Sequence, residues 1–265
     1  MTAIAVTIAG SDSGGGAGIQ GDLKTFSALG VYGASVVTAL TAQSTAGISA
    51  VHDVPPAFIA AQINAIFSDL DIGAVKIGML SQAAAVEAIT TGLDRWLPRN
   101  VVLDPVMLAS SGARLLAQEA VEPLKKLLFP RAGLLTPNLP EAAALLGVPL
   151  ACNESDMRMQ GERLLALGAR AVLIKGGHGG GAESVDLLIE PGRCMRFAAP
   201  RVAARNDHGT GCALSAAIAA ELAKGAALSE AVAAAKSYVT AALAGASRIE
   251  VGTGRGPLHH FHAWW

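Results

Sequence analysis

The stretch Val101-Val102-Leu103-Asp104-Pro105 decides the fold. Three consecutive apolar residues, without polar alternation, predict a strand that is buried on both faces, and Pro105 ends it. Similar short runs recur along the chain, at 4–8, 35–39, 75–77, 134–136 and 172–174. Helical patterns separate most of these runs, and strands that alternate with helices predict a mainly parallel sheet with helices on both faces. The predicted fold class is therefore α/β, with three layers.

Two helices can be placed from the sequence pattern. Between Phe58 and Leu70, apolar residues recur at helical spacing, so one face of that segment is expected to be buried. A second helix is expected to start near Asn153 and to close around Leu167, with acidic residues in its first turn. Segments 41–53 and 182–200 carry no helical pattern, and we expect small β elements beside the main sheet there. No linker, low-complexity block or repeat interrupts the chain, so residues 1–265 are expected to form a single domain.

Composition excludes several classes of protein. Of the 265 residues, 52% are hydrophobic and 15% charged, where about 25% charged is usual, so the chain buries a substantial core. The net charge of −1 argues against nucleic acid or a membrane surface as partner, because both attract a basic excess. Three scattered cysteines exclude a disulfide framework and favour a reducing compartment. With no signal-peptide pattern and no apolar stretch long enough to span a bilayer, we expect a soluble, cytoplasmic protein.

A glycine-rich loop follows the first expected strand, from Ala9 to Asp22. Gly16, Gly18 and Gly21 match the GxGxxG pattern of dinucleotide-binding proteins. Two features argue against that interpretation: the strand ends too far upstream, and no acidic residue occurs between 24 and 52 to bind a ribose. A loop whose backbone closes around a small polar ligand is favoured, and a dinucleotide-dependent oxidoreductase is kept as an alternative from another class.

A second glycine-rich turn, Asn206-Asp207-His208-Gly209-Thr210-Gly211-Cys212, directly precedes an alanine-rich helix. Free amides and the helix dipole make such a helix start an anion site, although Thr210 or Asp207 would also serve as an ordinary cap. Cys212 favours a catalytic role for this turn over an ordinary cap. The helix dipole is expected to lower the pKa of its thiol from about 8.5, so the thiol could act as a base or a nucleophile. The competing interpretation is a small buried core residue.

Polar residues also stand at the ends of three expected strands. Asp104 and Lys175 each end an apolar run, where an acid suits Mg²⁺ and a lysine suits phosphate. Asn138 and Glu141 follow the run at 134–136, and their spacing is that of a capping box, although both could also hold a hydrated magnesium ion. The C-terminal stretch 259–265 carries three histidines, and a packed aromatic tail is favoured there over a metal site.

Taken in order, these motifs resemble the ribokinase-like superfamily, and more narrowly the hydroxymethylpyrimidine/phosphomethylpyrimidine kinases of thiamine biosynthesis. The resemblance covers essentially the full length. It is carried by the stretches at 9–12, 21–26, 38–43, 76–80, 102–107, 136–142, 175–178 and 208–212, and by the C-terminal end. It implies a ribokinase-like three-layer fold, two successive phosphoryl transfers from ATP to an aminopyrimidine alcohol and to its monophosphate, and a homodimer.

The resemblance also assigns roles to residues. Gln43 would hydrogen-bond the aminopyrimidine, and Gly10, Asp22 and Met79 would line the same pocket. Gly209, Thr210, Gly211 and Cys212 would form the anion hole, with Cys212 where most ribokinase relatives have an aspartate base. Lys175 would contact the ATP phosphates, and Asp104, Asn138 and Glu141 would arrange Mg²⁺, partly through water.

Two further alternatives stay open. A pyridoxal or pyridoxamine kinase of the same superfamily is the nearer one, although the Gln43 amide, with its donor and its acceptor, favours an aminopyrimidine edge. A ligand-binding protein without turnover is the other, and it would not need Lys175, Asp104 or Cys212.

Overall fold

The computed structural model describes residues 1–108, 112, 114–177 and 179–265. His178, which belongs to one of the motifs quoted above, lies outside the described residues. Among the described residues, eight strands form one sheet in the order β10-β9-β8-β7-β6-β5-β1-β2. Their bounds are β1 Ile4–Ala9, β2 Tyr32–Val37, β5 Ala74–Ile77, β6 Val101–Leu103, β7 Leu134–Leu135, β8 Val172–Lys175, β9 Glu183–Glu190 and β10 Arg193–Pro200. The six strands from β8 to β2 pair in parallel, and β9 and β10 add an antiparallel edge.

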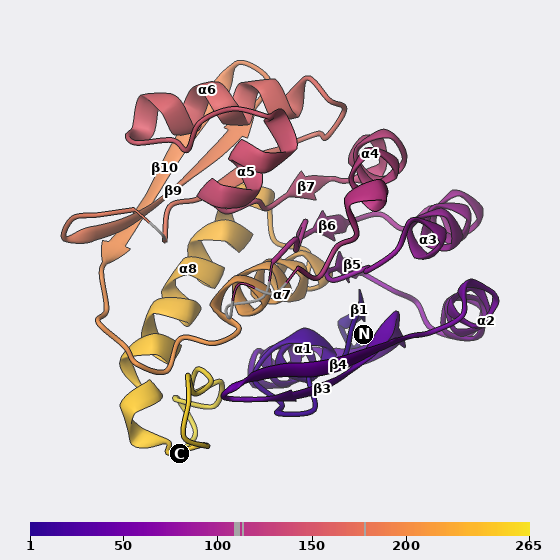
Figure 1. Ribbon diagram of the computed structural model, residues 1–265, viewed down its shortest axis with the longest axis horizontal. Helices are drawn as coiled ribbons and strands as arrows, with labels where there is room; N and C mark the ends of the chain where they lie inside the picture. The colour runs from indigo at the N-terminus through magenta and orange to yellow at the C-terminus, as the bar shows by residue number, and fades with distance from the viewer. Residues whose placement is uncertain (109–111, 113, 178) are drawn as a thin grey trace.

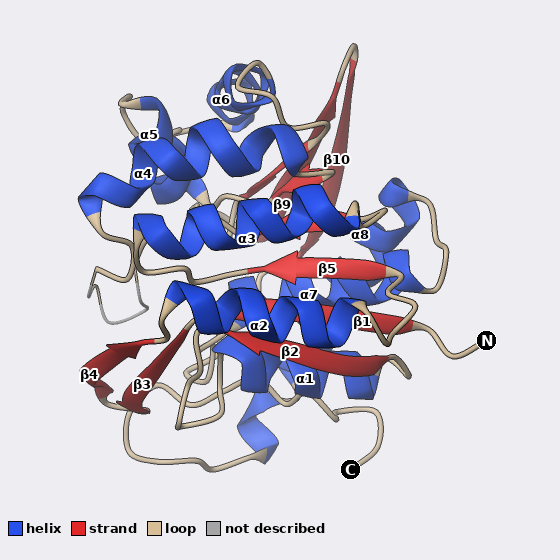
Figure 2. Ribbon diagram, turned by 90° about the vertical axis from the view of Figure 1, so that its right-hand side faces the viewer, coloured by secondary structure: helices blue, strands red, loops and turns tan. Residues whose placement is uncertain are grey.

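Helices cover both faces of this sheet (Figures 1 and 2). One face carries α2 Pro56–Phe67, α3 Ala83–Trp96, α5 Leu139–Leu146 and α6 Glu154–Leu165, together with a helical segment that runs through α4 Val121–Pro123 and η2 Leu124–Leu128. The other face carries α1 Gly18–Ala28, α7 Thr210–Ala223 and α8 Leu228–Ala244. Short 3-10 turns lie at η1 Gln118–Ala120, η3 Phe129–Arg131 and η4 Ala246–Arg248.

Strand β6 shows why the fold has three layers. Val101 and Leu103 belong to the apolar core under α2 and α3, whereas Val102 belongs to the core under α1, α7 and α8. All three residues are buried, because successive strand side chains point to opposite faces and helices cover both. The parallel three-layer prediction is confirmed.

The two segments predicted as small β elements behave differently. Residues 39–53 form a separate antiparallel pair, β3 Ala39–Ser44 and β4 Gly47–Asp53, which stands beyond the edge strand β2 (Figure 2). Residues 182–200 do not stand beside the main sheet: β9 and β10 belong to it, because β9 pairs along the whole length of β8. That part of the prediction is wrong. No helix in the described residues is long and apolar enough to cross a membrane.

Helix α7 is apolar on every side, and its eight residues from Ala213 to Ala220 are all buried. Small side chains let it lie close to α1 and α8 and directly over strands β1, β5 and β6. Its N-terminus therefore points at the carboxyl ends of the central parallel strands.

Candidate active site

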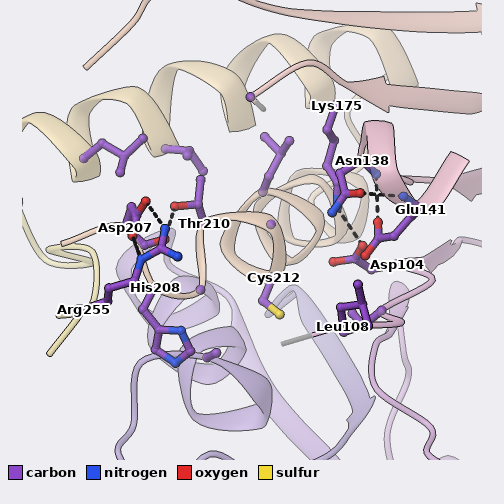
Figure 3. A pocket seen from close by; sticks show the side chains of 18 of the residues that line it. Asp104, Leu108, Asn138, Glu141, Lys175, Asp207, His208, Thr210, Cys212 and Arg255 are labelled. Carbon is purple, nitrogen blue, oxygen red and sulfur yellow. Dashed lines mark hydrogen bonds and ion pairs between the residues drawn. The ribbon is translucent and has the colours of Figure 1, made fainter. Parts of the chain in front are cut away.

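The polar residues predicted at strand ends meet in one cavity of about 1040 Å³. It lies along the carboxyl ends of β1, β5, β6 and β8 and at the N-terminus of α7, where an open parallel sheet binds its ligands. A volume of this size accommodates a small ring compound together with a nucleotide. Figure 3 shows Cys212 near the middle of the drawn part of the cavity, with Lys175, Asp104 and Glu141 on one side and His208 and Asp207 on the other.

The start of α7 is open as an anion site. Gly209 precedes the helix with a left-handed φ of 85°, and no side chain caps it. The Thr210 hydroxyl donates to the Asp207 carbonyl at 2.6 Å, so neither residue acts as the cap that the sequence also allowed. Among the described residues, no hydrogen bond engages the amides of Gly211 and Cys212. These two donors and the helix dipole are available to an anion.

Glycine is required at this turn by close approach as well as by its dihedral angle. A Cβ on Gly209 would come 2.1 Å from the Gly16 carbonyl oxygen, so the two glycine-rich loops touch there. At Gly211 a Cβ would lie 3.3 Å from Lys175 Nζ. Because Gly209 and Gly211 have no side chains, the amides at the start of α7 lie next to the Lys175 ammonium.

Lys175 and Asp104 form a buried ion pair beside that spot. Lys175 Nζ lies 2.8 Å from Asp104 Oδ1, and the Ser215 hydroxyl lies 3.0 Å from Asp104 Oδ2. Burial would lower the pKa of Lys175, but Asp104 and Glu141 outweigh it and raise that pKa, so the side chain is a cation. The predicted meeting of a strand-end acid and a strand-end lysine is found here.

Asn138 and Glu141 form the capping box at the start of α5. The Asn138 side chain accepts from the Glu141 amide at 2.8 Å, and the Glu141 carboxylate accepts from the Asn138 amide at 2.8 Å. Glu141 is nonetheless buried at the cavity wall, and burial raises its pKa to about 7, against the opposing charge of Lys175. A helix cap does not need to be buried at a cavity wall, so the capping box does not by itself explain where Glu141 lies.

The donors at this wall fit a magnesium ion that keeps part of its hydration. Magnesium favours oxygen ligands and is usually held by one or two carboxylates, several waters and the phosphates of its substrate. Asp104 and Glu141 supply two carboxylates on the same cavity, and Glu141 carries a raised pKa that a nearby cation would relieve. No group of three or more His, Cys, Asp or Glu side chains in the described part of the chain forms a closed metal site.

The prediction for the Cys212 pKa is wrong in direction. The thiol lies at the first turn of α7 as expected, and the Gly18 amide donates to it, but burial raises its pKa to about 11. The charge of Lys76 opposes this rise without overcoming it. Desolvation of a thiolate therefore outweighs the helix dipole at this position.

The glycine-rich loop after β1 closes around one of its own side chains rather than around a ligand. The amides of Gly14, Gly16 and Ala17 all donate to the Asp12 carboxylate, at 2.8, 3.1 and 2.9 Å. Burial would raise the pKa of Asp12, but these bonds and His208 lower it instead. The amides that would hold a pyrophosphate in a dinucleotide site are thus occupied, which removes the support for the oxidoreductase alternative.

His208 connects this loop to the β3–β4 pair. Its Nε2 lies 2.9 Å from Asp12 Oδ2 and 3.2 Å from the terminal amide of Gln43. Because Asp12 is a carboxylate and only accepts, His208 Nε2 carries the proton and cannot accept from Gln43. We therefore assign the Gln43 oxygen to the His208 side of its amide.

The opposite side of the amide agrees with this assignment. The single Thr41 hydroxyl proton is donated to the Ser11 carbonyl at 2.8 Å, so the hydroxyl accepts from the Gln43 N–H at 3.2 Å. Gln43 still offers one N–H and one oxygen lone pair to the cavity.

The remaining predicted pocket residues divide into two groups. Gly10 and Met79 line the cavity with Gln43, and a Cβ on Gly10 would collide with the Met79 sulfur at 2.9 Å. Asp22 does not line it: the side chain is fully buried behind the wall, where it bonds Lys76 and Thr7. Sequence reasoning missed Asp12, His208 and Lys76 as site residues. A lysine inside a run predicted to be a buried strand was the signal that could have revealed Lys76.

The C-terminal residues lie apart from this chemistry and are only partly packed. His259 and His260 are buried against α1 and α8, whereas Trp264 and Trp265 are each about 70% exposed. The aromatic tail is thus anchored by its histidines, while its two tryptophans face solvent.

Such a site suits the movement of a phosphoryl group. Uncapped amides and a lysine could neutralise the charge of a phosphate in transfer, two carboxylates on the same cavity suit a metal ion, and a separate part of the lining presents a single side-chain amide. Together with the three-layer sheet, this arrangement defines the class: a small-molecule kinase of ribokinase-like fold.

Comparison with known proteins places the chain more narrowly. A family model described as phosphomethylpyrimidine kinase matches residues 12–259. The hydroxymethylpyrimidine/phosphomethylpyrimidine kinase of Rhizobium meliloti is 58% identical over 265 residues, which cover 100% of this chain and 99% of that protein. The chain belongs to the phosphomethylpyrimidine kinase family.

Solved structures agree on the fold. A phosphomethylpyrimidine kinase from Clostridium difficile superposes with a TM-score of 0.80 at 46% identity, over 89% of this chain and 97% of that one. An ADP complex of Bacillus subtilis pyridoxal kinase superposes with a TM-score of 0.91 at 35% identity, over 99% of both chains. The ribokinase-like fold and the membership of a kinase family are confirmed.

Proposed function

We propose that the protein transfers phosphate from ATP to 4-amino-5-hydroxymethyl-2-methylpyrimidine and then to the resulting monophosphate, in thiamine biosynthesis. One observation supports this most strongly: the free amides of Gly211 and Cys212 lie beside Lys175 in a cavity that also presents Gln43. The family and the 58% identical kinase of R. meliloti supply the substrate class.

The pyrimidine lies at the end of the cavity formed by Gly10, Gln43 and Met79. An aminopyrimidine presents an amino donor next to a ring nitrogen acceptor, and the Gln43 amide presents the complementary oxygen and N–H. The ring then packs on the Met79 side chain, whose thioether is an adaptable apolar surface.

The nucleotide lies at the other end, along α8. Val239 and Leu243 supply apolar surface for a base, the segment 200–204 lines the same cavity, and Lys175 contacts the phosphates. Asp104 and Glu141 would hold Mg²⁺, partly through water, and Asn138 fixes the Glu141 carboxylate. The ion neutralises charge on the transferring phosphate when bound.

The first transfer joins the hydroxymethyl oxygen of the pyrimidine to the γ-phosphorus, and the bond from that phosphorus to the β–γ bridging oxygen breaks. The hydroxyl proton passes to Cys212 in its thiolate form, which is the minor form at neutral pH because burial raises the thiol pKa to about 11, and ADP leaves. The Gly211 and Cys212 amides stabilise the three equatorial oxygens as charge spreads over them.

The second transfer differs in its nucleophile. The acceptor is now an oxygen of a phosphate monoester, whose second pKa is about 6, so it carries no proton to be removed at neutral pH. Cys212 therefore has no proton to accept in this step. Its amide, which is backbone, still contributes to the anion hole.

A pyridoxal kinase is the second candidate, because the B. subtilis pyridoxal kinase is the more similar in fold, with a TM-score of 0.91. Gln43 favours the pyrimidine, since pyridoxal lacks an amino donor beside a ring nitrogen acceptor. We further propose a cytoplasmic homodimer, on the sparse cysteines and on the family resemblance.

The decisive experiment incubates the protein with Mg-ATP and the hydroxymethylpyrimidine and follows the products by mass spectrometry. The mono- and diphosphate should form in succession. A parallel incubation with pyridoxal distinguishes the second candidate, and products from pyridoxal alone would overturn the proposal.

A further inference from the structure

A fully buried lysine lies beneath the active site without a role in the chemistry described so far. Lys76 belongs to β5, its side chain has no exposure, and its Nζ lies 2.8 Å from Asp22 Oδ2. It stands opposite Thr7 on β1 and Val102 on β6. Val102 faces the side of the sheet covered by α1 and α7, and Asp22 belongs to α1. Lys76 therefore points to the side of the sheet on which α7 begins with Cys212.

The tip of the lysine reaches the cavity. A Cβ on Gly78 would lie 2.7 Å from Lys76 Nζ, so the ammonium lies against the backbone just beyond the end of β5. Lys76 lines the cavity with Cys212, whereas Asp22 does not. The positive end of the pair is thus the end nearer to the reacting groups.

The pair is poorly built for stability alone. Asp22 Oδ1 is buried and has no hydrogen-bond partner among the described residues. Taking two charges out of water costs several kcal/mol each, and apolar residues of similar size often replace such pairs without loss. A buried cation with an incompletely satisfied partner is therefore better explained by what its charge does to a neighbour.

We propose that Lys76 is a positioning residue that acts through Cys212: its buried ammonium, beside the cavity, stabilises the thiolate that accepts the proton of the first phosphoryl transfer. The inference rests on the proposed function for its kinetic consequence only. The coupling between Lys76 and Cys212 is a property of the protein without substrate.

The charges around the sulfur support this assignment. Lys76 on β5 and Lys175 on β8 favour the thiolate, whereas Asp22 on α1 and Asp104, which follows β6, oppose it. Burial would lower the pKa of Lys76, but Asp22, Cys212 and Asp104 raise it, so the lysine stays cationic. Burial raises the thiol pKa to about 11, and among the neighbours Lys76 acts most strongly against that rise. Loss of Lys76 would therefore raise the pKa of the Cys212 thiol further.

The first test measures the thiol in the absence of any substrate. In a Cys152→Ser/Cys194→Ser background, Cys212 is the only cysteine, and its alkylation rate by iodoacetamide against pH reports its ionisation. Lys76→Met should shift this profile to higher pH by at least about one unit, and Asp22→Asn should shift it to lower pH. Opposite shifts are not produced by simple loosening of the fold. Shifts in the same direction, or none for Lys76→Met, would overturn the proposal.

The second test uses the two transfers. Lys76→Met should slow the first phosphorylation by about 10-fold to 100-fold in kcat with little change in the KM of the pyrimidine, and should slow the second by less than about threefold. Equal loss in both steps would assign Lys76 a purely structural role and overturn the proposal.

A double variant, Lys76→Met/Asp22→Asn, removes both charges and guards against a misfolded single variant. Because the two charges act on the thiol in opposite directions, it should show a smaller selective loss of the first step than Lys76→Met alone, and a loss equal in both steps would overturn the proposal. Failure of the parent protein to phosphorylate the pyrimidine would instead overturn the proposed function, and the thiol measurement would still decide the coupling.

Discussion

Lys175 Nζ lies 2.8 Å from Asp104 Oδ1, although the two residues are 71 positions apart in the chain. Each ends a parallel strand, and the two strands, β8 and β6, are separated only by β7. The pair places a cation in direct contact with the carboxylate that we propose as a Mg²⁺ ligand. On the proposed function, phosphate would bind Lys175 and Mg²⁺ would bind Asp104, so two such contacts would replace the ion pair.

Replacing Lys175 with methionine should therefore impair transfer more than binding of the pyrimidine. We expect kcat/KM for ATP to fall by about 100-fold or more, since a cation aimed at the transferring phosphate is lost. The KM of the pyrimidine should stay within about threefold. Steady-state kinetics with each substrate varied in turn will measure both. Lys126→Met, at an exposed position of η2 that does not line the cavity, is the matched control and should change neither.

Cys212→Ala should separate the two phosphorylations. The first acceptor is a hydroxyl that must lose a proton, whereas the second is a phosphate oxygen that is already ionised at neutral pH. We expect the first step to slow by about 10-fold to 1000-fold, and the second by no more than about fivefold, with pyrimidine affinity nearly intact. Single-turnover assays started from the alcohol and from the monophosphate will compare them. If the first step is unaffected, Cys212 has no part in the mechanism.

Elements with strong local signals were predictable from the sequence, and juxtapositions between distant loops were not. The strand at 101–104 and the helix beginning at Asn153 were found because apolar runs and capping residues are local. By contrast, Gly209 touches Gly16 through a contact that spans most of the chain, and no spacing announces it.

The errors have physical causes of the same kind. The predicted direction of the Cys212 pKa shift was wrong. The dipole of its helix can be inferred from the sequence, whereas the burial that outweighs the dipole comes from the surrounding tertiary structure. The segment 182–200 was placed outside the sheet because antiparallel pairing with β8 is a tertiary choice. The amides of the first glycine-rich loop were assigned to a ligand because Asp12 was not recognised as their acceptor.

Glu141 should make magnesium use depend on pH near neutrality. Burial raises its pKa to about 7, so about half of the molecules carry a protonated Glu141 at that pH, and a metal must displace the proton to bind. We expect the apparent Mg²⁺ affinity to weaken as pH falls through about 7 and to level off above about 8. Titration of activity with Mg²⁺ at several pH values will show this. Glu141→Gln should bind Mg²⁺ weakly at every pH, and a variant with an unchanged pH profile would contradict the assignment.

The same carboxyl makes a signed prediction for stability without metal. A carboxyl whose pKa is raised in the folded state stabilises the fold fully below its unfolded value of 4.5, and this contribution is lost as pH rises through about 7. Glu141→Gln should therefore gain stability relative to the parent between about pH 5 and pH 8, by roughly 1–3 kcal/mol. Urea unfolding in the presence of a chelator measures the difference.

His260 should make the protein sensitive to mild acid. The Thr25 hydroxyl donates to the Gly21 carbonyl at 2.9 Å, so it accepts from His260 Nδ1 at 3.2 Å, and the buried Nε2 has no partner among the described residues. Burial lowers the pKa of His260 to about 4. A depressed pKa gives stability that is present above the unfolded value of about 6.5 and is lost as pH falls towards 4.

The expected loss between about pH 7.5 and pH 5 is roughly 2 kcal/mol. Replacing His260 with glutamine should remove this loss, although the variant will be less stable at pH 7.5. Urea unfolding at both pH values gives the comparison, with the exposed His52→Gln as the control that should keep the acid sensitivity of the parent. Equal acid sensitivity in both variants would exclude His260 as its source.

His208 should set substrate preference through Gln43. Its Nε2 proton is donated to Asp12, which leaves the Gln43 oxygen on the histidine side of the amide and directs the N–H to Thr41 and the cavity. Without the His208 N–H, the Gln43 amide can adopt either orientation, so it no longer selects the edge of an aminopyrimidine over that of another ring. His208→Phe keeps a flat ring but removes the donor, so it should raise the KM of the aminopyrimidine by about 10-fold, equivalent to about one lost hydrogen bond. The preference for the pyrimidine over pyridoxal should fall by a similar factor, which competition between the two substrates will measure.

Thr41→Val removes the other partner of the same amide and should shift the preference in the same direction. A preference unchanged in both variants would mean that the Gln43 amide is oriented by the substrate itself.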